Sequence, residues 1–329
     1  MRRDRLSRYA RIGSLAAVVP PSLGYYRLEM DLTTHSRDSS GATRPLVLGM
    51  RVDSIELDDA AELVSRWVGE VGAAGETEPS AQEEHPTAVM LLRAGAPRAR
   101  TICAANVHMV MESWDDASYR ALVNRADLVL PDGQPVVWAL RVLGAPQRRR
   151  VRVSPDFLLR LFAEAERRGF SVGLYGGSDE TLPVFRALLA ERFPRLRVPF
   201  AYAPPFRPPT HEEDQQVVAR IGSTGVQLLL VGLGCPKQER WMAEHGQGVS
   251  CVMIGVGGAF DLFGGRTREA PRWTRDIGLE WAFRLAQEPR RLWRRHAKHD
   301  PRFVALLAWQ VARRATRRPS ATCGPPTPE

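Results

Sequence analysis

The chain has 329 residues, of which 44% are hydrophobic and 25% are charged, a composition typical of soluble globular proteins with a substantial core. Lys and Arg number 46 against 37 Asp and Glu, which gives a net charge of +9 at pH 7. No apolar run approaches the roughly 20 residues that a membrane-spanning helix needs, so the sequence does not predict an integral membrane protein.

The first part of the chain predicts little structure. Residues 1–44 are rich in Arg, Ser and Thr without periodicity, which is typical of a flexible leader. Their apolar run Gly13–Val19 is short and ends at Pro20, so we do not expect a secretory signal. A folded domain is expected over residues 45–276, interrupted by a surface insertion over residues 72–98, where Gly, Ala, Glu, Pro and Ser dominate.

Strand and helix patterns alternate after the insertion. Apolar strand-like runs occur at 102–105, 128–130, 172–175, 226–231 and 252–256. Helical patterns occur at 60–67 and, between the later strands, at 157–168, 181–192 and 212–221. This alternation predicts an α/β fold, with a Rossmann-like parallel sheet covered by helices on both faces.

The C-terminal part predicts a basic helical appendage over residues 277–312, followed by a disordered tail over residues 313–329. Between Arg284 and Arg318 the chain carries eleven Lys or Arg residues but only two acidic residues, Glu288 and Asp300. Pro289 is expected either to begin a new helix or to kink a continuous one. Such a concentration of positive charge attracts phosphates, whether in a substrate, a lipid surface or a nucleic acid.

Polar and glycine-rich motifs follow the predicted strands, where ligands bind in parallel sheets. They are Ala104-Ala-Asn106-Val-His108, Pro131-Asp-Gly133, Tyr175-Gly-Gly-Ser178, Gly232-Leu-Gly-Cys-Pro-Lys-Gln-Glu239 and Gly255-Val-Gly-Gly-Ala-Phe-Asp261. Together they indicate an active-site crevice. None completes a dinucleotide-binding fingerprint or a P-loop, which disfavours an NAD enzyme and a P-loop NTPase.

Several of these blocks, in this order, resemble the WecG/TagA/CpsF family of bacterial glycosyltransferases. The resemblance extends from Leu46 to Arg295. It rests on Pro131-Asp-Gly133 with Val136-Val-Trp138, Gly234-Cys-Pro-Lys-Gln-Glu239, Gly255-Val-Gly-Gly-Ala-Phe-Asp261, Leu279-Glu-Trp281 with Arg284-Leu285, and Glu288-Pro-Arg-Arg-Leu292.

The resemblance implies an inverting transfer of an N-acetylmannosamine-type sugar from a UDP-sugar to a polyprenyl-diphosphate-linked N-acetylglucosamine, in teichoic acid or other surface polysaccharide synthesis. It also implies a cytoplasmic enzyme attached peripherally to the inner face of the cell membrane, with no cofactor and no metal. No Asp-x-Asp motif for a divalent cation is present in the sequence. A non-catalytic, sugar-nucleotide-binding or scaffold paralogue is the alternative.

By matching position, Asp132 resembles the catalytic base and Asn106 a substrate-contacting residue. From the residues alone, the alternatives are that Asp132 caps a helix and that Asn106 stabilises a turn. The other expected substrate-binding residues are Arg150, Gly176, Gly177, Lys237, Gln238, Glu239, Gly257 and Asp261. Arg150 could instead belong to a solvated basic run, and Lys237 could form a salt bridge with Glu239.

The basic appendage is expected to hold the lipid diphosphate and to contact an anionic membrane surface through Arg284, Arg290, Arg291, Arg294 and Arg295. A solvated basic helix is the alternative. We do not expect nucleic acid as a partner, because the sequence has no recognition motif for it. The sequence does not indicate an oligomeric state.

The chain departs from the family pattern at three places. Ala104 stands where Thr is common, the block from Arg150 to Asp156 lacks its glycine, and Glu269 replaces an arginine. These departures leave the donor sugar and the detailed geometry of the diphosphate site open, but they do not remove the proposed base.

Overall fold

The computed structural model describes residues 35–37, 43–76, 98–276 and 278–316. Most of the expected leader, most of the expected insertion and residues 317–329 of the expected tail therefore lie outside the described residues.

The strands are β1 (His35–Arg37), β2 (Thr43–Val47), β3 (Met50–Arg51), β4 (Arg100–Ala105), β5 (Leu128–Pro131), β6 (Ser171–Gly176), β7 (Arg197–Tyr202), β8 (Leu228–Gly232) and β9 (Val252–Gly255). The helices are α1 (Leu57–Glu76), α3 (Val107–Asp115), α4 (Ala117–Arg125), α5 (Gln134–Val142), the π-helix η3 (Val153–Phe157), α6 (Leu158–Arg168), α7 (Thr181–Arg192), α8 (His211–Ser223), α9 (Lys237–His245), α10 (Ala259–Phe263), α11 (Arg272–Asp276), α12 (Glu280–Gln287) and α13 (Pro289–Thr316).

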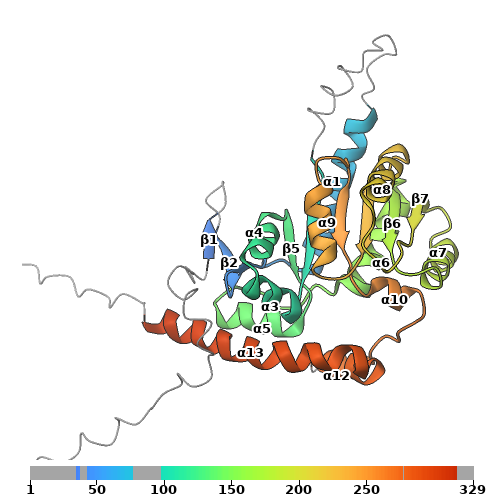
Figure 1. Ribbon diagram of the computed structural model, residues 1–329. Coiled ribbons are helices and arrows are strands. Elements are labelled where there is room, and N and C mark those ends of the chain that lie inside the picture. The colour runs from blue at the N-terminus through green and yellow to red at the C-terminus, as the bar shows by residue number, and fades with distance from the viewer. Residues whose placement is uncertain (1–34, 38–42, 77–97, 277, 317–329) are drawn as a thin grey trace, which may run out of the picture. The chain divides into compact units, whose positions relative to one another are not determined.

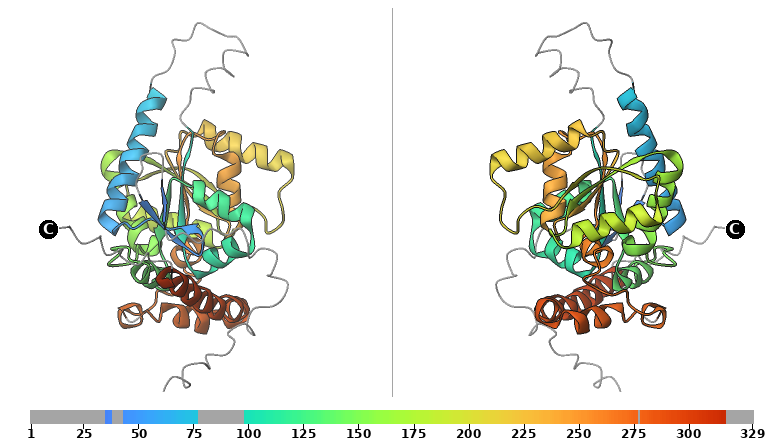
Figure 2. Two further views of the ribbon diagram at one scale, coloured as in Figure 1. Left: turned by 90° about the vertical axis from the view of Figure 1, so that its left-hand side faces the viewer. Right: turned by 90° about the vertical axis from the view of Figure 1, so that its right-hand side faces the viewer.

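A six-stranded, all-parallel sheet forms the centre of the domain, with strand order β5-β4-β9-β8-β6-β7 (Figure 1). Successive side chains of β4 enter two different hydrophobic clusters. Cys103 and Ala105 pack with α3, α4 and α9 on one face, whereas Ile102 and Ala104 pack with α1, α6 and α7 on the other (Figure 2). The predicted Rossmann-like sheet with helices on both faces is confirmed.

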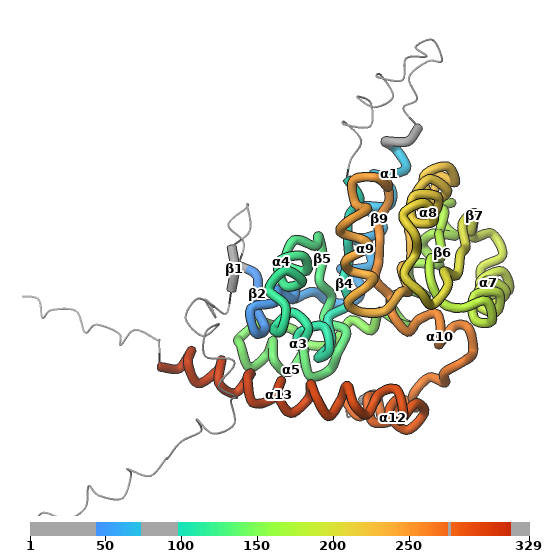
Figure 3. Tube along the Cα trace, viewed as in Figure 1, coloured from blue at the N-terminus to red at the C-terminus, as the bar shows by residue number. Residues whose placement is uncertain are grey.

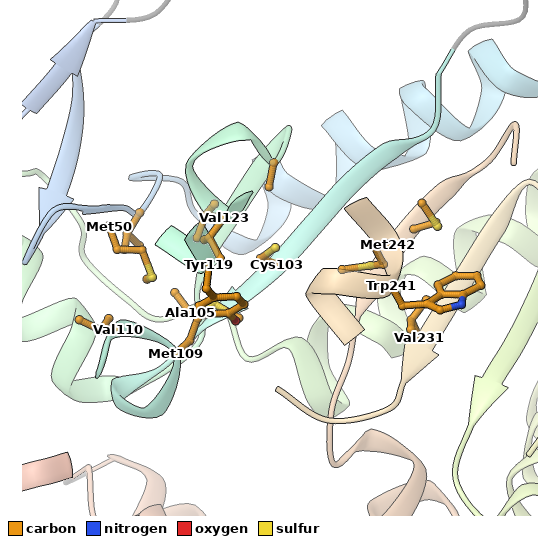
Figure 4. Packing of buried hydrophobic residues seen from close by; sticks show 14 of the residues in the cluster. Met50, Cys103, Ala105, Met109, Val110, Tyr119, Val123, Val231, Trp241 and Met242 are labelled. Carbon is orange, nitrogen blue, oxygen red and sulfur yellow. The ribbon is translucent and has the colours of Figure 1, made fainter. Parts of the chain in front are cut away.

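Large side chains fill the first of these clusters. Tyr119 of α4 lies beside Cys103 and Ala105 of β4, and Trp241 of α9 lies beside Val231 of β8 (Figure 4). Because both faces of the sheet are covered, its strands are nearly continuous apolar runs, which is the pattern that made them recognisable in the sequence.

Two β elements were missed by the sequence prediction. The strand β7 lies at the edge of the sheet and contains Pro199, which an edge strand tolerates because one of its sides needs no hydrogen-bonding partner. Before α1, β2 and β3 form an antiparallel hairpin through a two-residue turn, in which both Leu48 (φ 52°) and Gly49 (φ 82°) are left-handed. With β1 and β2, strands occur inside the segment expected to be a leader.

The C-terminal appendage consists of α12 and the long helix α13, which passes α3 and α5 at the carboxyl edge of the sheet (Figure 3). Pro289 begins α13 at its first turn, as one of the two expectations had it. The helix ends at Thr316, four residues beyond the expected boundary at 312. Arg314 in this last turn donates a hydrogen bond to the carbonyl of Leu143.

A buried glutamine fixes α13 to the N-terminal hairpin. Gln310 is 1% exposed. Its Nε2 donates to the carbonyl of Leu46 at 3.0 Å, and its Oε1 accepts from the amide of Leu48 at 3.1 Å. One side chain thus satisfies two backbone groups that would otherwise be buried without partners.

We predict that Gln310→Ala lowers the free energy of unfolding by about 2–4 kcal/mol, because two buried backbone groups lose their partners. Denaturant titration followed by circular dichroism measures this change. Gln216→Ala, on the exposed face of α8, is the matched control and should change stability by less than about 0.5 kcal/mol. Equal effects of the two substitutions would contradict the assigned role.

Candidate active site

The carboxyl ends of the parallel strands open into two cavities. The first, which we call the polar cavity, has a volume of about 600 Å³ and lies where β6, β8 and β9 end. β6 continues through α7 to β7 on one side, whereas β8 continues through α9 to β9 on the other. The cavity therefore lies at a point where the winding of the sheet reverses, which is where open α/β sheets bind ligands.

Glycine backbone lines much of the polar cavity. Gly177, Gly234 and Gly257 have φ values of 77°, 81° and 51°, in the left-handed region that favours glycine. An added Cβ at Gly234 or Gly257 would meet nothing within 4 Å, so it would project into open space. Such loops bring backbone amides close to a ligand, and amides suit phosphate oxygens.

Gln238 and Glu239 lie behind one of these loops. The Oε1 atom of Gln238 accepts a hydrogen bond from the amide of Gly257 at 3.1 Å, and its Nε2 donates to Glu239. The Tyr119 hydroxyl donates to the other oxygen of Glu239 at 3.0 Å. Gln238 lines the polar cavity, whereas Glu239 does not. This buried chain of hydrogen bonds fixes the shape of the Gly257 loop.

The other residues expected around the donor are divided between the cavity and its surroundings. Asp261 lines the polar cavity and lies 3.8 Å from Arg266. Gly176 does not line the polar cavity but packs against the neighbouring strand, where an added Cβ would come within 2.6 Å of the backbone of Gly232. Lys237 is exposed at the start of α9 and lines neither cavity. Among the described residues it forms no ion pair with Glu239.

The second cavity, which we call the apolar cavity, has a volume of about 740 Å³ and lies between α5 and α13. Trp138 and Val142 of α5 face Phe303, Val304 and Leu307 of α13 across it. Trp138 and Val304 remain 47% and 65% exposed. An exposed apolar surface of this kind suits a hydrocarbon ligand.

The two cavities meet. The residues that line both of them, here called the junction, are Asn106, His108, Asp132, Arg152, Ser154, Glu280, Arg284 and Arg295. A ligand in the polar cavity and one in the apolar cavity can therefore contact each other at Asp132.

Asp132 does not cap a helix with its side chain. The N-cap of α5 is Gly133, without a side-chain hydrogen bond. The Asp132 Oδ1 atom accepts a hydrogen bond from the amide of Val153 at 2.9 Å. No donor among the described residues contacts Oδ2, which is therefore available to a ligand. Burial raises the pKa of Asp132 above its ordinary 3.8, against the opposing effects of the Val153 hydrogen bond, Arg284 and Arg150.

Asn106 has two roles in this arrangement. It is the N-cap of α3, with Oδ1 accepting from the amide of Met109 at 3.1 Å. It also lines the junction, so its amide nitrogen can serve a ligand. Ser154, at the same place, has a buried hydroxyl with no hydrogen-bonding partner among the described residues.

The arginines near the junction differ in how far they are neutralised. Arg150 and Arg284 both pair with Glu280. Arg291 lines the polar cavity and pairs with Glu288. Arg295 lines both cavities, and no carboxylate of the described residues lies within 4.0 Å of its guanidinium.

Two further arginines expected to bind a lipid diphosphate, Arg290 and Arg294, are exposed on α13 and line neither cavity.

His108, Glu112 and His299 form the one group among the described residues that could hold a metal ion, with ligand atoms within 4.8 Å of one another. Burial, followed by the charge of Arg295, lowers the pKa of His108 to about 4. Burial also lowers the pKa of His299. Neutral imidazoles can ligate metals, but the nearby cations Arg295 and Lys298 oppose a dication here.

Four junction residues were not among the site residues expected from the sequence: His108, Arg152, Ser154 and Glu280. Arg152 lies two residues after the expected Arg150, inside the block that departs from the family pattern. Glu280 lies in the motif Leu279-Glu-Trp281, which carried the resemblance without an assigned role. Both become recognisable only when the fold places the start of α12 beside the residues that precede η3.

A family model, the WecG/TagA/CpsF family of glycosyl transferases, matches residues 80–317. The chain belongs to this family. It is therefore an enzyme, a glycosyltransferase of cell-surface polysaccharide synthesis, and the family implies a sugar-nucleotide donor and a lipid-linked acceptor in general. The match starts later than the resemblance expected from Leu46 and extends past Arg295, so that it includes all of α13. Within the described residues, no helix is both long and apolar enough to cross a membrane.

We predict that Gly257→Ala weakens the binding of a nucleoside diphosphate such as UDP roughly tenfold, which corresponds to about 1.4 kcal/mol. The added methyl group would project into the polar cavity. Gly225→Ala is the matched control, because Gly225 also has a positive φ (62°) and open space at its Cβ but lines neither cavity. Calorimetric titration with UDP measures both dissociation constants, and equal affinities would show that the Gly257 loop does not contact the nucleotide.

Proposed function

We propose that the protein is an inverting glycosyltransferase, which moves an N-acetylmannosamine-type sugar from a UDP-sugar to a polyprenyl-diphosphate-linked N-acetylglucosamine. The observation that carries this proposal is the junction, where a polar cavity and an apolar cavity share Asp132 and a set of arginines. A nucleotide sugar suits the first cavity and a lipid-linked sugar suits the second. A non-catalytic paralogue would have no need for such a meeting point.

In this proposal Asp132 is the general base. Its Oδ2 atom takes the proton of the acceptor hydroxyl while that oxygen attacks the anomeric carbon of the donor. The new glycosidic bond forms on the face opposite the bond to UDP, which breaks with its electron pair remaining on the β-phosphate. The proton ends on Asp132, and the configuration at the anomeric carbon is inverted. Its raised pKa makes Asp132 a stronger base than an ordinary aspartate.

The negative charge that develops on the departing UDP requires nearby cations. Arg284 and Arg295 line both cavities and could reach either diphosphate. The backbone amides of Gly177 and Gly234 are suited to the donor diphosphate in the polar cavity, whereas the amide of Gly257 is held by Gln238. In this arrangement fixed cations and amides replace a metal ion.

We also propose that the enzyme attaches peripherally to the inner, cytoplasmic face of the cell membrane. Trp273, Trp281 and Trp293 are 65%, 42% and 52% exposed and lie on or next to the appendage. Arg290 and Arg294 are exposed beside Trp293. Tryptophan anchors at the level of lipid headgroups and arginine is attracted to anionic lipid, so this surface suits a membrane that presents the apolar cavity with its acceptor.

A donor and acceptor panel tests the proposal. Purified protein is incubated with a set of UDP-sugars and a short-chain prenyl-diphosphate N-acetylglucosamine, and the release of UDP and the anomeric configuration of the product are measured. We expect turnover with UDP-N-acetylmannosamine and an inverted product. No turnover with any UDP-sugar, or a retained configuration, would contradict the proposed reaction.

We predict that Asp132→Asn lowers kcat by at least about 100-fold, because the amide cannot accept the hydroxyl proton. The wild-type enzyme should lose activity as the pH falls through the raised pKa of Asp132, so the acid limb of its kcat profile lies above pH 3.8. Steady-state kinetics over a range of pH measure both effects. A folded Asp132→Asn variant with wild-type kcat would exclude this residue as the base.

We predict that transfer needs no divalent metal. EDTA should leave kcat within about twofold of its untreated value, since arginines and amides neutralise the leaving group. The measurement is UDP release with and without EDTA. A complete loss of activity that Mn²⁺ restores would refute a metal-independent mechanism.

A further inference from the structure

Glu280 is a buried carboxylate at the junction, and nothing in the proposed reaction uses it. It is the first residue of α12, is 7% exposed and lines both cavities. A carboxylate taken out of water at this depth needs compensating cations. The burial of this carboxylate inside the site, rather than at the surface, therefore needs a functional explanation.

Arginines from two parts of the chain converge on this carboxylate. Arg150 pairs with Oε2, and the Nε atom of Arg152 lies 3.6 Å from the same oxygen. Arg284, one turn further along α12, pairs with Oε1 at 2.9 Å. The side chains of Arg150, Arg152 and Glu280 are all at most 13% exposed, so solvent screens these pairs weakly.

The same charges act on Asp132. Arg284 and Arg150 lower the pKa of Asp132, whereas Glu280 raises it. A site that binds two diphosphates requires cations, but those cations make a neighbouring carboxylate a weaker base. Glu280 opposes this effect without removing the arginines from the site.

We propose that Glu280 is a positioning residue for the transfer reaction: its carboxylate holds Arg150, Arg152 and Arg284 in place at the junction and balances their charge, so that Asp132 remains an effective base beside them. The inference rests on the proposed function, in which Asp132 takes the hydroxyl proton. It assigns to α12 an electrostatic role in the reaction, in addition to covering the site.

The test is the pH dependence of kcat in Glu280→Gln, which keeps the shape of the side chain and removes its charge. The acid limb should move to lower pH, because Asp132 loses a neighbouring negative charge and retains the arginines. At neutral pH kcat should fall roughly tenfold, because the base is weaker. Any rise in the KM values for donor and acceptor should be smaller than the fall in kcat, because the arginines lose the partner that holds them but remain in the site.

Two further variants separate charge from structure. Glu280→Asp keeps the charge and should return the acid limb toward its wild-type position. Asp156→Asn is the matched control, because Asp156 pairs with Arg152 at 2.9 Å but is 46% exposed and lines neither cavity. It should leave the acid limb where it is.

The inference is overturned if Glu280→Gln loses activity through a higher KM with an unmoved acid limb, or if Glu280→Asp behaves like Glu280→Gln. Should Glu280→Gln fail to fold, Arg284→Gln provides the complementary measurement. It removes a cation that lowers the pKa of Asp132, so the acid limb must move to higher pH. If Asp132→Asn is inactive but the acid limbs of Glu280→Gln and Arg284→Gln do not move, only the role of Glu280 is rejected. If Asp132→Asn is active, the proposed function itself is rejected.

Discussion

The docking of α13 across the carboxyl edge of the sheet is the constraint on which the rest of the site depends. Without this helix, α3 after β4 would lose a cover, and the apolar cavity beside Asp132 would lose one wall. Contacts of two kinds hold the helix. The buried Gln310 forms hydrogen bonds with the backbone of the N-terminal hairpin, and the guanidinium of Arg302 forms an ion pair with the Asp115 carboxylate of α3 at 2.6 Å. The helix also buries its own side chains Leu292 and Phe303. The helix thus supplies one wall of the apolar cavity and encloses the junction.

Enclosure has an electrostatic consequence. The family implies a sugar-nucleotide donor and a lipid-linked acceptor. In the proposed reaction both carry a diphosphate, and arginine is well suited to hold the two diphosphates at one point. The reaction also needs a base, and arginines next to a carboxylate make it a poor one. In this protein burial raises the pKa of Asp132 and Glu280 adds to that effect, so in the proposed reaction the base and the cations coexist within one site.

Much of the fold and part of the site were predictable from the sequence. The apolar strands could be recognised because both faces of the sheet are buried, and the logic of parallel strands placed Asn106 and Asp132 at one edge. The edge strand β7 was missed because Pro199 and its half-exposed side chains interrupt the apolar pattern.

Individual side-chain directions were less predictable. Lys237, Gln238 and Glu239 are consecutive in one motif, but successive residues on a helix point about 100° apart, so α9 turns Lys237 outward and buries the other two. Arg152 and Glu280 are far apart in the sequence and meet at the junction because the first residue of α12 pairs with Arg150 and Arg152, which precede η3. No local sequence pattern predicts that these two residues lie together.

The most direct test of the account is an experimental structure with UDP and a short-chain prenyl-diphosphate N-acetylglucosamine bound together. The account predicts the nucleotide in the polar cavity, the prenyl chain between α5 and α13, and the acceptor hydroxyl within about 3.2 Å of the Asp132 carboxylate. A complex in which Asp132 points away from both ligands, or in which the prenyl chain lies outside the apolar cavity, would contradict it.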